Sequence, residues 1–466
     1  MATLKTIFWI CVFLVFYTYI GYGLLLWALV KIKRIVKGGA VKTVLPADDV
    51  LPDVTFMVCA YNEQDVVDMK MDNTLQLDYP KEKLHVVWVT DGSTDETNER
   101  LKRYPEVEVI FTPERKGKTA ALNHGISMVK SDITIMTDAN TMVNKEAVRE
   151  IVRCFQDPQV ACVAGEKRVI ARKAGEIAAE GEGLYWKYES FLKRLDSEFY
   201  SAMGAAGELN AIRTSMYETM PENALLDDFV MSMRMVDKGY KIAYTSDAYA
   251  MEYGSADLQE ESKRKRRIAA GGLQSSWWLR KMMNPLRHPV VAFQFVSHRV
   301  LRWTITPIAL FALIPLNVLL VMMKAGDLYV AIWILQVLFY AAAFGGWGAG
   351  MTTLCIFMAI DYITGLLVAG VFHASKKSES GRLDSRAGFK GLLRKGMILL
   401  IVLIAARLDI LLNTTIGRDA VVIAFCANEA ISIVENAGLM GVPIPAALRR
   451  AIEALDSKGN EDGEDE

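Results

Sequence analysis

The sequence lacks the cysteine patterns of small secreted domains and of zinc-binding domains. Its 6 cysteines are scattered and form no C-x-x-C pair, so neither a disulfide framework nor a zinc site is predicted. It also lacks a surplus of basic residues, because the formal net charge is −1, and this excludes the broad basic face of a nucleic-acid-binding protein. The phosphate loops G-x-x-x-x-G-K-[ST] and G-x-G-x-x-G are missing, so nucleoside triphosphatases and dinucleotide-binding enzymes are not indicated.

The chain does have long uncharged runs near both ends. Residues 7–30 are long enough to cross a bilayer and too long for the core of a signal peptide. Lys31, Lys33 and Arg34 follow directly, and the positive-inside rule places the residues after them in the cytoplasm. We therefore predict a transmembrane helix within residues 1–35 and a cytoplasmic domain after it.

Further apolar segments follow residue 302, at 303–323, 328–347, 351–373, 396–412 and 420–441. The later ones carry ionisable residues such as Asp361 and Glu429, which at membrane depth usually face a helix bundle or a water path. An alternative is that Arg407 and Asp409 only mark a segment end near the lipid headgroups.

The basic stretch 374–395 does not fit a simple count of spans. The positive-inside rule predicts that it is cytoplasmic, whereas three spans between it and the cytoplasmic domain would place it outside. Either one segment is interfacial or re-entrant, or the two parts of the chain were not built for one topology.

Residues 51–255 alternate between strand-like and helical stretches. The strand-like runs lie at 53–60, 84–90, 107–111, 132–137 and 160–165. Helical stretches fill the gaps, notably 117–130 and 145–156. This alternation predicts an α/β domain with a Rossmann-like, mostly parallel sheet and helices on both faces, in which ligands bind beyond the carboxyl ends of the strands.

Polar side chains follow three of these strands. Tyr61 and Glu63 come after the first strand, Asp91 after the second, and Asp138 and Asn140 after the fourth. Each group alone is weak evidence, because Asp and Asn commonly begin turns and helices. Since parallel strands end at one edge of a sheet, the three groups together predict one crevice lined by acids and amides.

Later stretches add candidate functional residues. Lys116 and Lys118 stand at a helix start and can hold a diphosphate, although a solvated loop is the alternative. The glycine-punctuated stretch 201–213 is predicted as a turn that lets an acceptor approach closely. Asp227 and Asp228 open a helix, where Asp227 is either an N-cap or half of an acidic pair that raises the pKa of a catalytic base.

A basic run at residues 263–267 comes before the apolar segments. Its charges either anchor the chain to lipid headgroups or neutralise a leaving diphosphate, and different arginines can serve each purpose. Trp277, Trp278 and Arg280 continue the run as a predicted interfacial amphipathic helix.

These motifs together resemble the family 2 glycosyltransferases, in the membrane-bound bacterial branch related to synthases of hyaluronan, cellulose and poly-N-acetylglucosamine. The resemblance covers about residues 1–346 and rests on CAYNE, VTDGSTDET, GKTAALN, TDANT, VAGEKRV, YWKYE, LLDDF, RKRRIAAGG and SHRVLRW, in this order. It implies a GT-A fold and inverting transfer from a nucleotide sugar, most often a UDP sugar, to a saccharide or lipid-linked acceptor, with Mg²⁺ or Mn²⁺. It also implies a multi-pass protein of the bacterial cytoplasmic membrane whose catalytic domain is cytoplasmic.

The resemblance assigns roles to individual residues. The implied roles are nucleoside binding by Tyr61, Glu63 and Asp91, diphosphate binding by Lys118, metal and nucleotide binding by Asp138, metal binding by Asn140, catalysis by Asp227 and Asp228, and donor binding by Arg267. In this scheme Asp228 is the base and Asp227 its acidic neighbour. Arg267 stands where the family has a Q-x-x-R-W motif, and the motif's tryptophan is missing here, so the resemblance leaves polymer extrusion open.

Residues from about 345 to 466 resemble a different family, the toxin-secretion and phage-lysis holins, for example in FGGWGAGMTTLCIFMAIDYITGLLVAGVF. We interpret the chain as a fusion whose junction lies near residues 345–347, with possible homo-oligomerisation through the holin-like region. The predicted parts are a transmembrane helix at 1–35, a GT-A domain at 51–255, a basic interfacial segment at 256–302, transmembrane helices at 303–346 and a holin-like membrane domain with an acidic tail at 347–466.

Three functions compete at this point. The chain is a membrane glycosyltransferase with a holin-like anchor, a pore or secretion protein with a passenger enzyme, or a phosphoryl or nucleotidyl transferase with similar acids. The acids at three strand ends and the Asp227–Asp228 pair favour the first, because a passenger need not keep them. The third lacks support from the downstream motifs.

Overall fold

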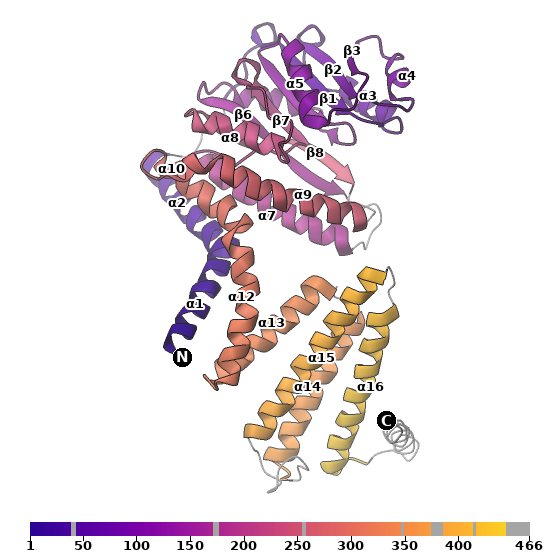
Figure 1. Ribbon diagram of the computed structural model, residues 1–466. Coiled ribbons are helices and arrows are strands. Elements are labelled where there is room, and N and C mark those ends of the chain that lie inside the picture. The colour runs from indigo at the N-terminus through magenta and orange to yellow at the C-terminus, as the bar shows by residue number, and fades with distance from the viewer. Residues whose placement is uncertain are drawn as a thin grey trace. The chain divides into compact units, whose positions relative to one another are not determined.

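The computed structural model describes residues 1–38, 43–170, 177–253, 258–345, 349–373, 385–412 and 416–443 (Figure 1). The chain divides into two compact units, one formed by Ile10–Leu310 and the other by Met1–Trp9 together with Phe311–Glu466. The first is called the α/β unit and the second the helical unit.

The α/β unit is built on an eight-stranded sheet in the order β3-β2-β1-β4-β7-β6-β8-β5. Its strands are β1 Val54–Ala60, β2 Leu84–Asp91, β3 Val107–Thr112, β4 Ile133–Asp138, β5 Met142–Val143, β6 Val160–Ile170, β7 Leu209–Arg213 and β8 Lys241–Tyr253. The pairs β1–β2, β1–β4, β2–β3 and β6–β8 are parallel, whereas β7 is antiparallel to both of its neighbours. The predicted α/β architecture of GT-A type, with a mostly parallel sheet, is confirmed.

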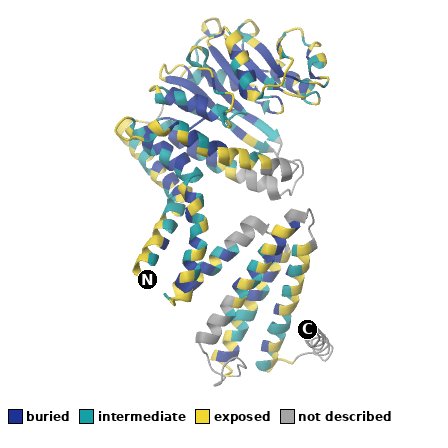
Figure 2. Cartoon of the chain, viewed as in Figure 1, coloured by how far each residue is buried: buried dark blue, intermediate teal, exposed yellow. Residues whose placement is uncertain are grey.

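Helices cover both faces of this sheet. The helices of the unit are α2 Tyr22–Lys37, α3 Val67–Leu75, α4 Thr97–Leu101, α5 Lys118–Met128, α6 Ala147–Cys154, α7 Ile177–Phe199, α8 Asp227–Asp237, α9 Leu258–Trp278, α10 Pro289–Phe295 and α11 Leu301–Trp303. Phe56 and Trp88 face the core formed with α3 and α6, while Met57 and Val89 face the core formed with α5 and α8. Because both faces are covered, β1 and β2 are buried at successive positions, as Figure 2 shows.

The sequence patterns do not predict β5, β7 and β8. The stretch 201–213, predicted as a turn, is a turn only as far as Glu208, and β7 occupies the rest. β7 inserts between β4 and β6 through antiparallel pairing with strands that lie far away in the sequence. Short-range patterns cannot reveal such a pairing, and the five residues of β7 are too few for a clear period.

Two buried acids on α7 fasten the start of the chain to the end of this unit. Asp196 is fully buried and accepts hydrogen bonds from the Tyr22 hydroxyl and from His298 Nδ1. Glu189 pairs with the Arg299 guanidinium at 2.7 Å. The SHRVLRW motif, residues 297–303, is therefore held against α7 and α2. Its charged residues pair with the two acids of α7 and lie before the next apolar helix.

The helical unit contains long apolar helices. They include α13 Asp327–Gly345, α14 Ala349–Gly370, α15 Ser385–Leu412 and α16 Ile416–Leu439, while α1 Ala2–Phe16 and α12 Ile305–Met322 belong partly to each unit. Among the described residues, the helices long and apolar enough to cross a membrane are Ala2–Lys37, Ile305–Met322, Gly350–Gly370 and Gly417–Leu439. The segment predicted at 396–412 is helical within α15, and the described part of the segment predicted at 328–347 is helical within α13, but the described apolar part of α13 is shorter, Asp327–Leu338. Because several of its helices are long and apolar enough to cross a bilayer, the protein is a membrane protein.

Ionisable residues in this unit meet between helices. Lys395 on α15 donates to Asp361 on α14 at 2.8 Å and pairs with Glu429 on α16 at 2.5 Å. Asp409 accepts hydrogen bonds from the first backbone N–H groups of α16, those of Gly417 and Arg418. Asp409 therefore caps a helix, in line with the alternative that it marks a segment end. Part of the basic stretch 374–395 lies outside the described residues, and the side of the membrane it occupies stays a prediction.

Candidate active site

One cavity of about 290 Å³ contains four of the nine predicted site residues. Its lining includes Lys118 at the start of α5, Asp138 at the end of β4, and Asp227 and Asp228 at the start of α8. The remaining lining residues are Cys59, Leu122, Met136, Thr137, Gly207, Asn210 and Met231. The carboxyl end of β4 and the starts of α5 and α8 thus bring together side chains that lie up to 110 positions apart.

A lysine–carboxylate pair occupies the centre of this cavity. Lys118 Nζ lies 2.5 Å from Asp138 Oδ1, whereas Asp138 Oδ2 accepts no hydrogen bond from any residue that the structure describes. Gly207 faces the pair, because a Cβ atom placed on it would lie 3.1 Å from Lys118 Nζ and 3.5 Å from Asp228 Oδ2. The absence of a side chain at Gly207 therefore keeps the space between the cation and the acids open.

Asp227 and Asp228 differ in their surroundings. The N-cap of α8 is Leu226, so the alternative that Asp227 is an N-cap is wrong. Asp227 Oδ2 is buried and has no hydrogen-bond partner among the described residues. Asp228 Oδ1 accepts the Phe229 N–H at 2.8 Å. Burial and then the charge of Asp227 raise the pKa of Asp228 to about 7, against the opposing effect of Lys118, so Asp228 is able to exchange a proton near neutral pH.

Asp91 organises the basic loop that precedes α5. Its side chain is buried, and its two oxygens accept the backbone N–H groups of Lys116 and Gly117 at 2.9 and 2.6 Å. Gly92 has a φ of 66°, and a Cβ atom there would lie 2.5 Å from the backbone nitrogen of Arg115. Asp91 and Gly92 therefore fix the loop that delivers Lys118, a contribution that the sequence reasoning missed.

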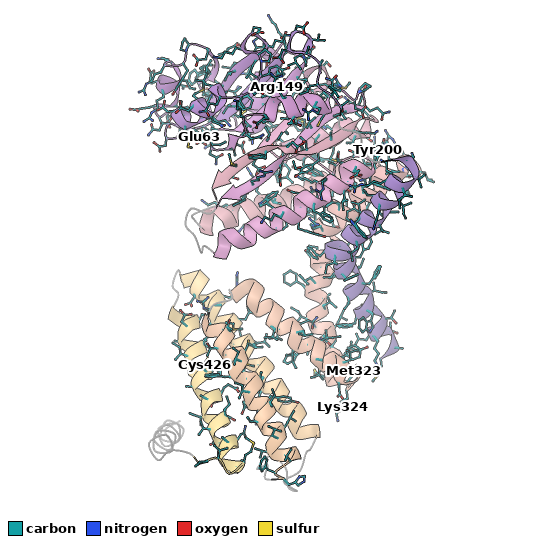
Figure 3. The ribbon with its side chains drawn as sticks, turned by 180° about the vertical axis from the view of Figure 1, so that it is seen from behind. Glu63, Arg149, Tyr200, Met323, Lys324 and Cys426 are labelled. Atoms are coloured by element: carbon teal, nitrogen blue, oxygen red, sulfur yellow. The ribbon has the colours of Figure 1, made fainter. Side chains whose placement is uncertain are left out.

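Tyr61 and Glu63 lie on the loop after β1, beside the loop after β2. The Arg115 guanidinium stacks 3.7 Å from the centre of the Tyr61 ring, which adds a cation–π contact. Asn62, at a φ of 53°, accepts the Thr94 N–H through its side chain and so ties the two loops together. Figure 3 labels Glu63. Burial and then the charge of Asp138 raise the pKa of Glu63. Tyr61, Glu63 and Asp91 thus belong to one edge of the sheet, although they do not line the cavity itself.

Arg267 and Asn140 are less closely associated with the cavity. Both are exposed, and neither is among its lining residues. From the same basic run, Arg264 approaches the site instead, with Nη2 3.4 Å from Glu208 Oε1. The predicted donor-binding role of Arg267 and metal-binding role of Asn140 stay predictions.

Glu208 and Lys167 are site neighbours that sequence reasoning missed. Glu208 follows Gly207, and its carboxylate pairs with Lys167 Nζ at 2.7 Å, while Lys167 also pairs with Glu252 at 2.5 Å. Although burial opposes it, the Lys167 ammonium lowers the pKa of Glu208 to about 2. The sequence gives no sign of this pairing, because β6, the turn before β7 and β8 contribute one residue each and meet only in the folded sheet.

The donor set at Asp138 suits a divalent cation that arrives with a diphosphate. One carboxylate oxygen of Asp138 is open to the cavity, and the amide of Asn140 stands two residues away. Mg²⁺ is commonly held by one or two protein oxygens together with substrate phosphates, rather than by a complete protein cage. Within the described residues no cluster of three or more His, Cys, Asp or Glu side chains offers such a cage.

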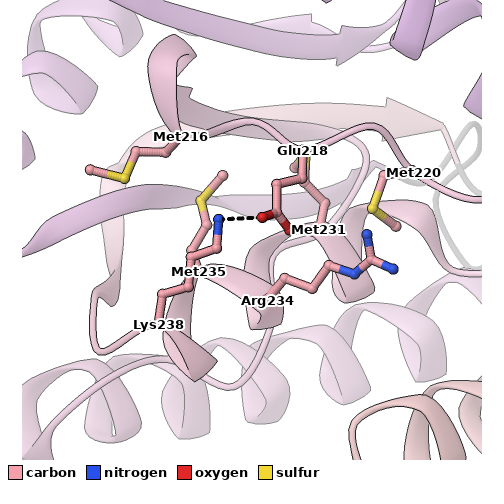
Figure 4. Close-up of a pocket in the computed structure, with 7 residues that line it drawn as sticks. All are labelled: Met216, Glu218, Met220, Met231, Arg234, Met235 and Lys238. Carbon is pink, nitrogen blue, oxygen red and sulfur yellow. Dashed lines mark ion pairs between the residues drawn. The ribbon is translucent and has the colours of Figure 1, made fainter.

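A second cavity, of about 190 Å³, lies farther along α8 and shares Met231 with the first (Figure 4). It is lined by Met216, Glu218, Met220, Met231, Arg234, Met235 and Lys238. Glu218 and Lys238 form an ion pair at 2.7 Å, and the methionines supply no acid or base. We therefore assign the chemistry to the cavity that contains Asp138 and Asp228.

The chain matches two protein families in two separate parts. Residues 52–271 match the glycosyltransferase-like family 2, and residues 338–457 match the bacteriophage holin family. An uncharacterized protein of Clostridium perfringens is 39% identical over 119 residues, which are 25% of this chain and 82% of the relative. Poly-beta-1,6-N-acetyl-D-glucosamine synthase of Staphylococcus aureus is 27% identical over 240 residues, which are 48% of this chain and 55% of the synthase.

Among solved structures, the fold resembles that of a mannosyltransferase from Pyrobaculum calidifontis determined with GDP-Man and Mn²⁺. The TM-score is 0.54 at 23% sequence identity, and the likeness covers 74% of this chain and 98% of the mannosyltransferase. The match to the staphylococcal synthase spans only about half of the length of that relative. It therefore supports membership of the family, but it does not show that this chain has the synthase's activity. The chain is a family 2 glycosyltransferase over residues 52–271, joined to a bacteriophage holin family region over residues 338–457.

Proposed function

We propose that this protein is a membrane-bound inverting glycosyltransferase that moves a sugar from a nucleotide sugar, a UDP sugar, to a hydroxyl group of a saccharide or lipid-linked acceptor. The observation that carries the proposal is the shared cavity of Lys118, Asp138 and Asp228. It offers a cation for a leaving diphosphate and, a few ångströms away, a carboxylate suited to accept a proton.

In the proposed reaction, Asp228 takes the proton of the acceptor hydroxyl. The acceptor oxygen then forms a bond to the anomeric carbon on the face opposite the diphosphate, and the bond from that carbon to the diphosphate oxygen breaks. The nucleoside diphosphate leaves with the electron pair of this bond. Because its pKa is raised to about 7, Asp228 is a stronger base than an ordinary carboxylate, and a large fraction of it is ionised near neutral pH.

Lys118 and the residues around it bind the donor in this proposal. Lys118 gives up part of its contact with Asp138 to neutralise the charge that develops on the diphosphate. Mg²⁺ or Mn²⁺ held by Asp138 and Asn140 would supply further neutralising charge there. Tyr61, Glu63 and Asp91 would hold the nucleoside, as the family resemblance implies.

The test of this proposal is the substitution Asp228→Asn. It keeps the shape of the side chain but removes the base, so we expect kcat to fall by about 10²- to 10⁴-fold while the KM for the donor changes little. Turnover is measured with a panel of radiolabelled UDP sugars on purified membranes, and the product is sized. Asp237→Asn, at the opposite end of α8, is the matched control and should retain activity. Undiminished turnover in Asp228→Asn would remove Asp228 from the mechanism.

A pore or secretion function remains the second candidate because residues 338–457 match the holin family. Under that reading, cells that express the full chain should leak a small dye, whereas cells that express residues 1–346 should not. Under the first reading, the holin-like region is an anchor or an oligomerisation module, and both chains leave the membrane tight.

A further inference from the structure

Lys70, on the inner face of α3, is a buried cation directly behind the acidic edge of the cavity. It is 0% exposed, and its ammonium donates to the Thr141 carbonyl oxygen at 2.5 Å and to Thr137 Oγ1 at 3.1 Å. Burial lowers the pKa of Lys70 to about 7, and the nearby charge of Asp138 opposes the decrease. Burying an amine is costly unless it is hydrogen-bonded, so the two contacts are the reason that a lysine is tolerated there.

The two partners of Lys70 flank the turn Asp138–Asn140, called here the DAN turn. Thr137 Oγ1 donates to the Glu208 carbonyl oxygen at 2.9 Å. Thr141 Oγ1 donates to the Asp138 carbonyl oxygen at 2.9 Å. Lys70 therefore completes a hydrogen-bonded network that fixes both ends of the DAN turn and joins the turn to Glu208, the residue before β7.

We propose that Lys70 is a positioning residue, whose ammonium holds the DAN turn in the geometry in which Asp138 and Asn140 bind a metal–diphosphate group. This inference rests on the proposed function of Asp138 and Asn140. Lys70 contacts neither the cavity nor those two side chains, so it acts only through Thr137 and Thr141. Displacing a binding group by about 1 Å is enough to cost about 100-fold in such sites, so a support of this kind is functionally important.

Lys70→Met is the variant that isolates this role. Methionine has a similar unbranched length but no hydrogen-bond donor, so it keeps the packing of α3 against the sheet. It also removes the cost of burying an amine, which offsets part of the lost hydrogen bonding, and we expect the domain to fold. A scan of thermal unfolding on the same samples verifies this.

The experiment measures binding of UDP to the purified full-length protein in lipid nanodiscs by calorimetry. Each protein is titrated at saturating Mn²⁺ and again in EDTA. We expect Lys70→Met to raise the Kd for UDP in Mn²⁺ by about 10- to 100-fold, the range found when the support behind a metal ligand is removed. The Kd in EDTA should not change, because that binding does not use the metal face of the DAN turn.

Lys83→Met is the matched control. Like Lys70, Lys83 donates two hydrogen bonds; it donates to the backbone carbonyl oxygens of Asp49 and Leu51, at 2.6 and 2.7 Å, and it does not support the DAN turn. It should leave both Kd values unchanged. If Lys70→Met fails to fold, Thr141→Val decides, because it removes the hydroxyl that holds the Asp138 carbonyl oxygen and should give the same metal-specific loss.

The outcomes separate this inference from the proposed function. A wild-type Kd in Mn²⁺ for Lys70→Met, or an equal loss with and without Mn²⁺, overturns the positioning role while leaving the glycosyltransferase proposal intact. If the wild-type protein itself binds no UDP in the presence of Mn²⁺, the proposed donor is wrong and the inference falls with it.

Discussion

Lys70 in the α/β unit is buried among neutral hydrogen-bond partners, whereas Lys395 in the helical unit is half-buried between two acids. In the α/β unit the partners of Lys70 are neutral oxygens. The acids Asp227 and Asp228 line a cavity in which the cation Lys118 is paired with a third acid, Asp138. In the helical unit Lys395 lies between Asp361 and Glu429 on two other helices. Acids left at a cavity can take up protons or cations, whereas acids paired across helices hold those helices together. The first arrangement is typical of a catalytic site, and the second of a structural contact.

The largest effect that this comparison predicts is on the stability of the helical unit. Lys395→Met leaves two carboxylates facing each other without their shared cation, and breaking a buried ion pair on one side costs about 3–5 kcal/mol. Lys70→Met leaves no carboxylate without its cation, so it should lower the free energy of unfolding by much less. We expect Cys355 and Cys426, which are half-buried on α14 and α16, to react faster with a maleimide in Lys395→Met, because local opening exposes them further.

Lys324→Met is the control for this measurement, since Lys324 lies in the exposed turn between α12 and α13 (Figure 3). It should leave the labelling rates unchanged. Glycosyl transfer should survive in both variants. Slow labelling in Lys395→Met would mean that the ion pairs do not hold these helices together, and the contrast between the units would then be lost.

A smaller effect is expected on the pH dependence of turnover. Burial and the charge of Asp227 raise the pKa of Asp228 to about 7, so the ionised base decreases about tenfold for each pH unit below that value. We therefore expect kcat to rise with pH up to about 7 and then to level off. Asp227→Asn removes the neighbouring negative charge and should shift this rise to lower pH. Initial rates measured across the pH range test this, and an unshifted rise in Asp227→Asn would mean that the two acids are not coupled.

The sequence predicts the α/β unit well where local patterns determine the structure. The strands that end at Ala60, Asp91 and Asp138 are apolar runs followed by polar residues, and parallel pairing then brings their ends together without further information. What the sequence does not reveal depends on distant contacts. Lys70 looks like a surface residue of an amphipathic helix, and only its contact with Thr141, 71 positions later, shows that it is buried.

The helical unit illustrates the opposite limit. Apolar runs predict the bounds of α13, α14 and α16 to within a few residues, because length and hydropathy are local properties, but α15 begins at Ser385, eleven residues before the predicted segment and within the stretch predicted as a loop. They do not predict that Lys395, the last residue of the basic stretch 374–395, pairs with Asp361 and Glu429 on two other helices. The span count also stays unresolved, since α13 and α15 are helices without the full apolar length of a span among the described residues.

The smallest predicted effect concerns Asn140, where the open acidic edge of the α/β unit has an amide in place of a second carboxylate. If Asn140 is a metal ligand, Asn140→Asp adds a negative charge to the metal and should tighten Mn²⁺ binding, measured by electron paramagnetic resonance, by several-fold. Gln159→Glu adds the same charge at the amino end of β6, which is the opposite edge of the sheet, and should have no effect. Unchanged Mn²⁺ affinity in Asn140→Asp would show that Asn140 is not a ligand. The acid that matters for the metal would then be Asp138 alone, and the cation would depend on the donor diphosphate for its remaining ligands.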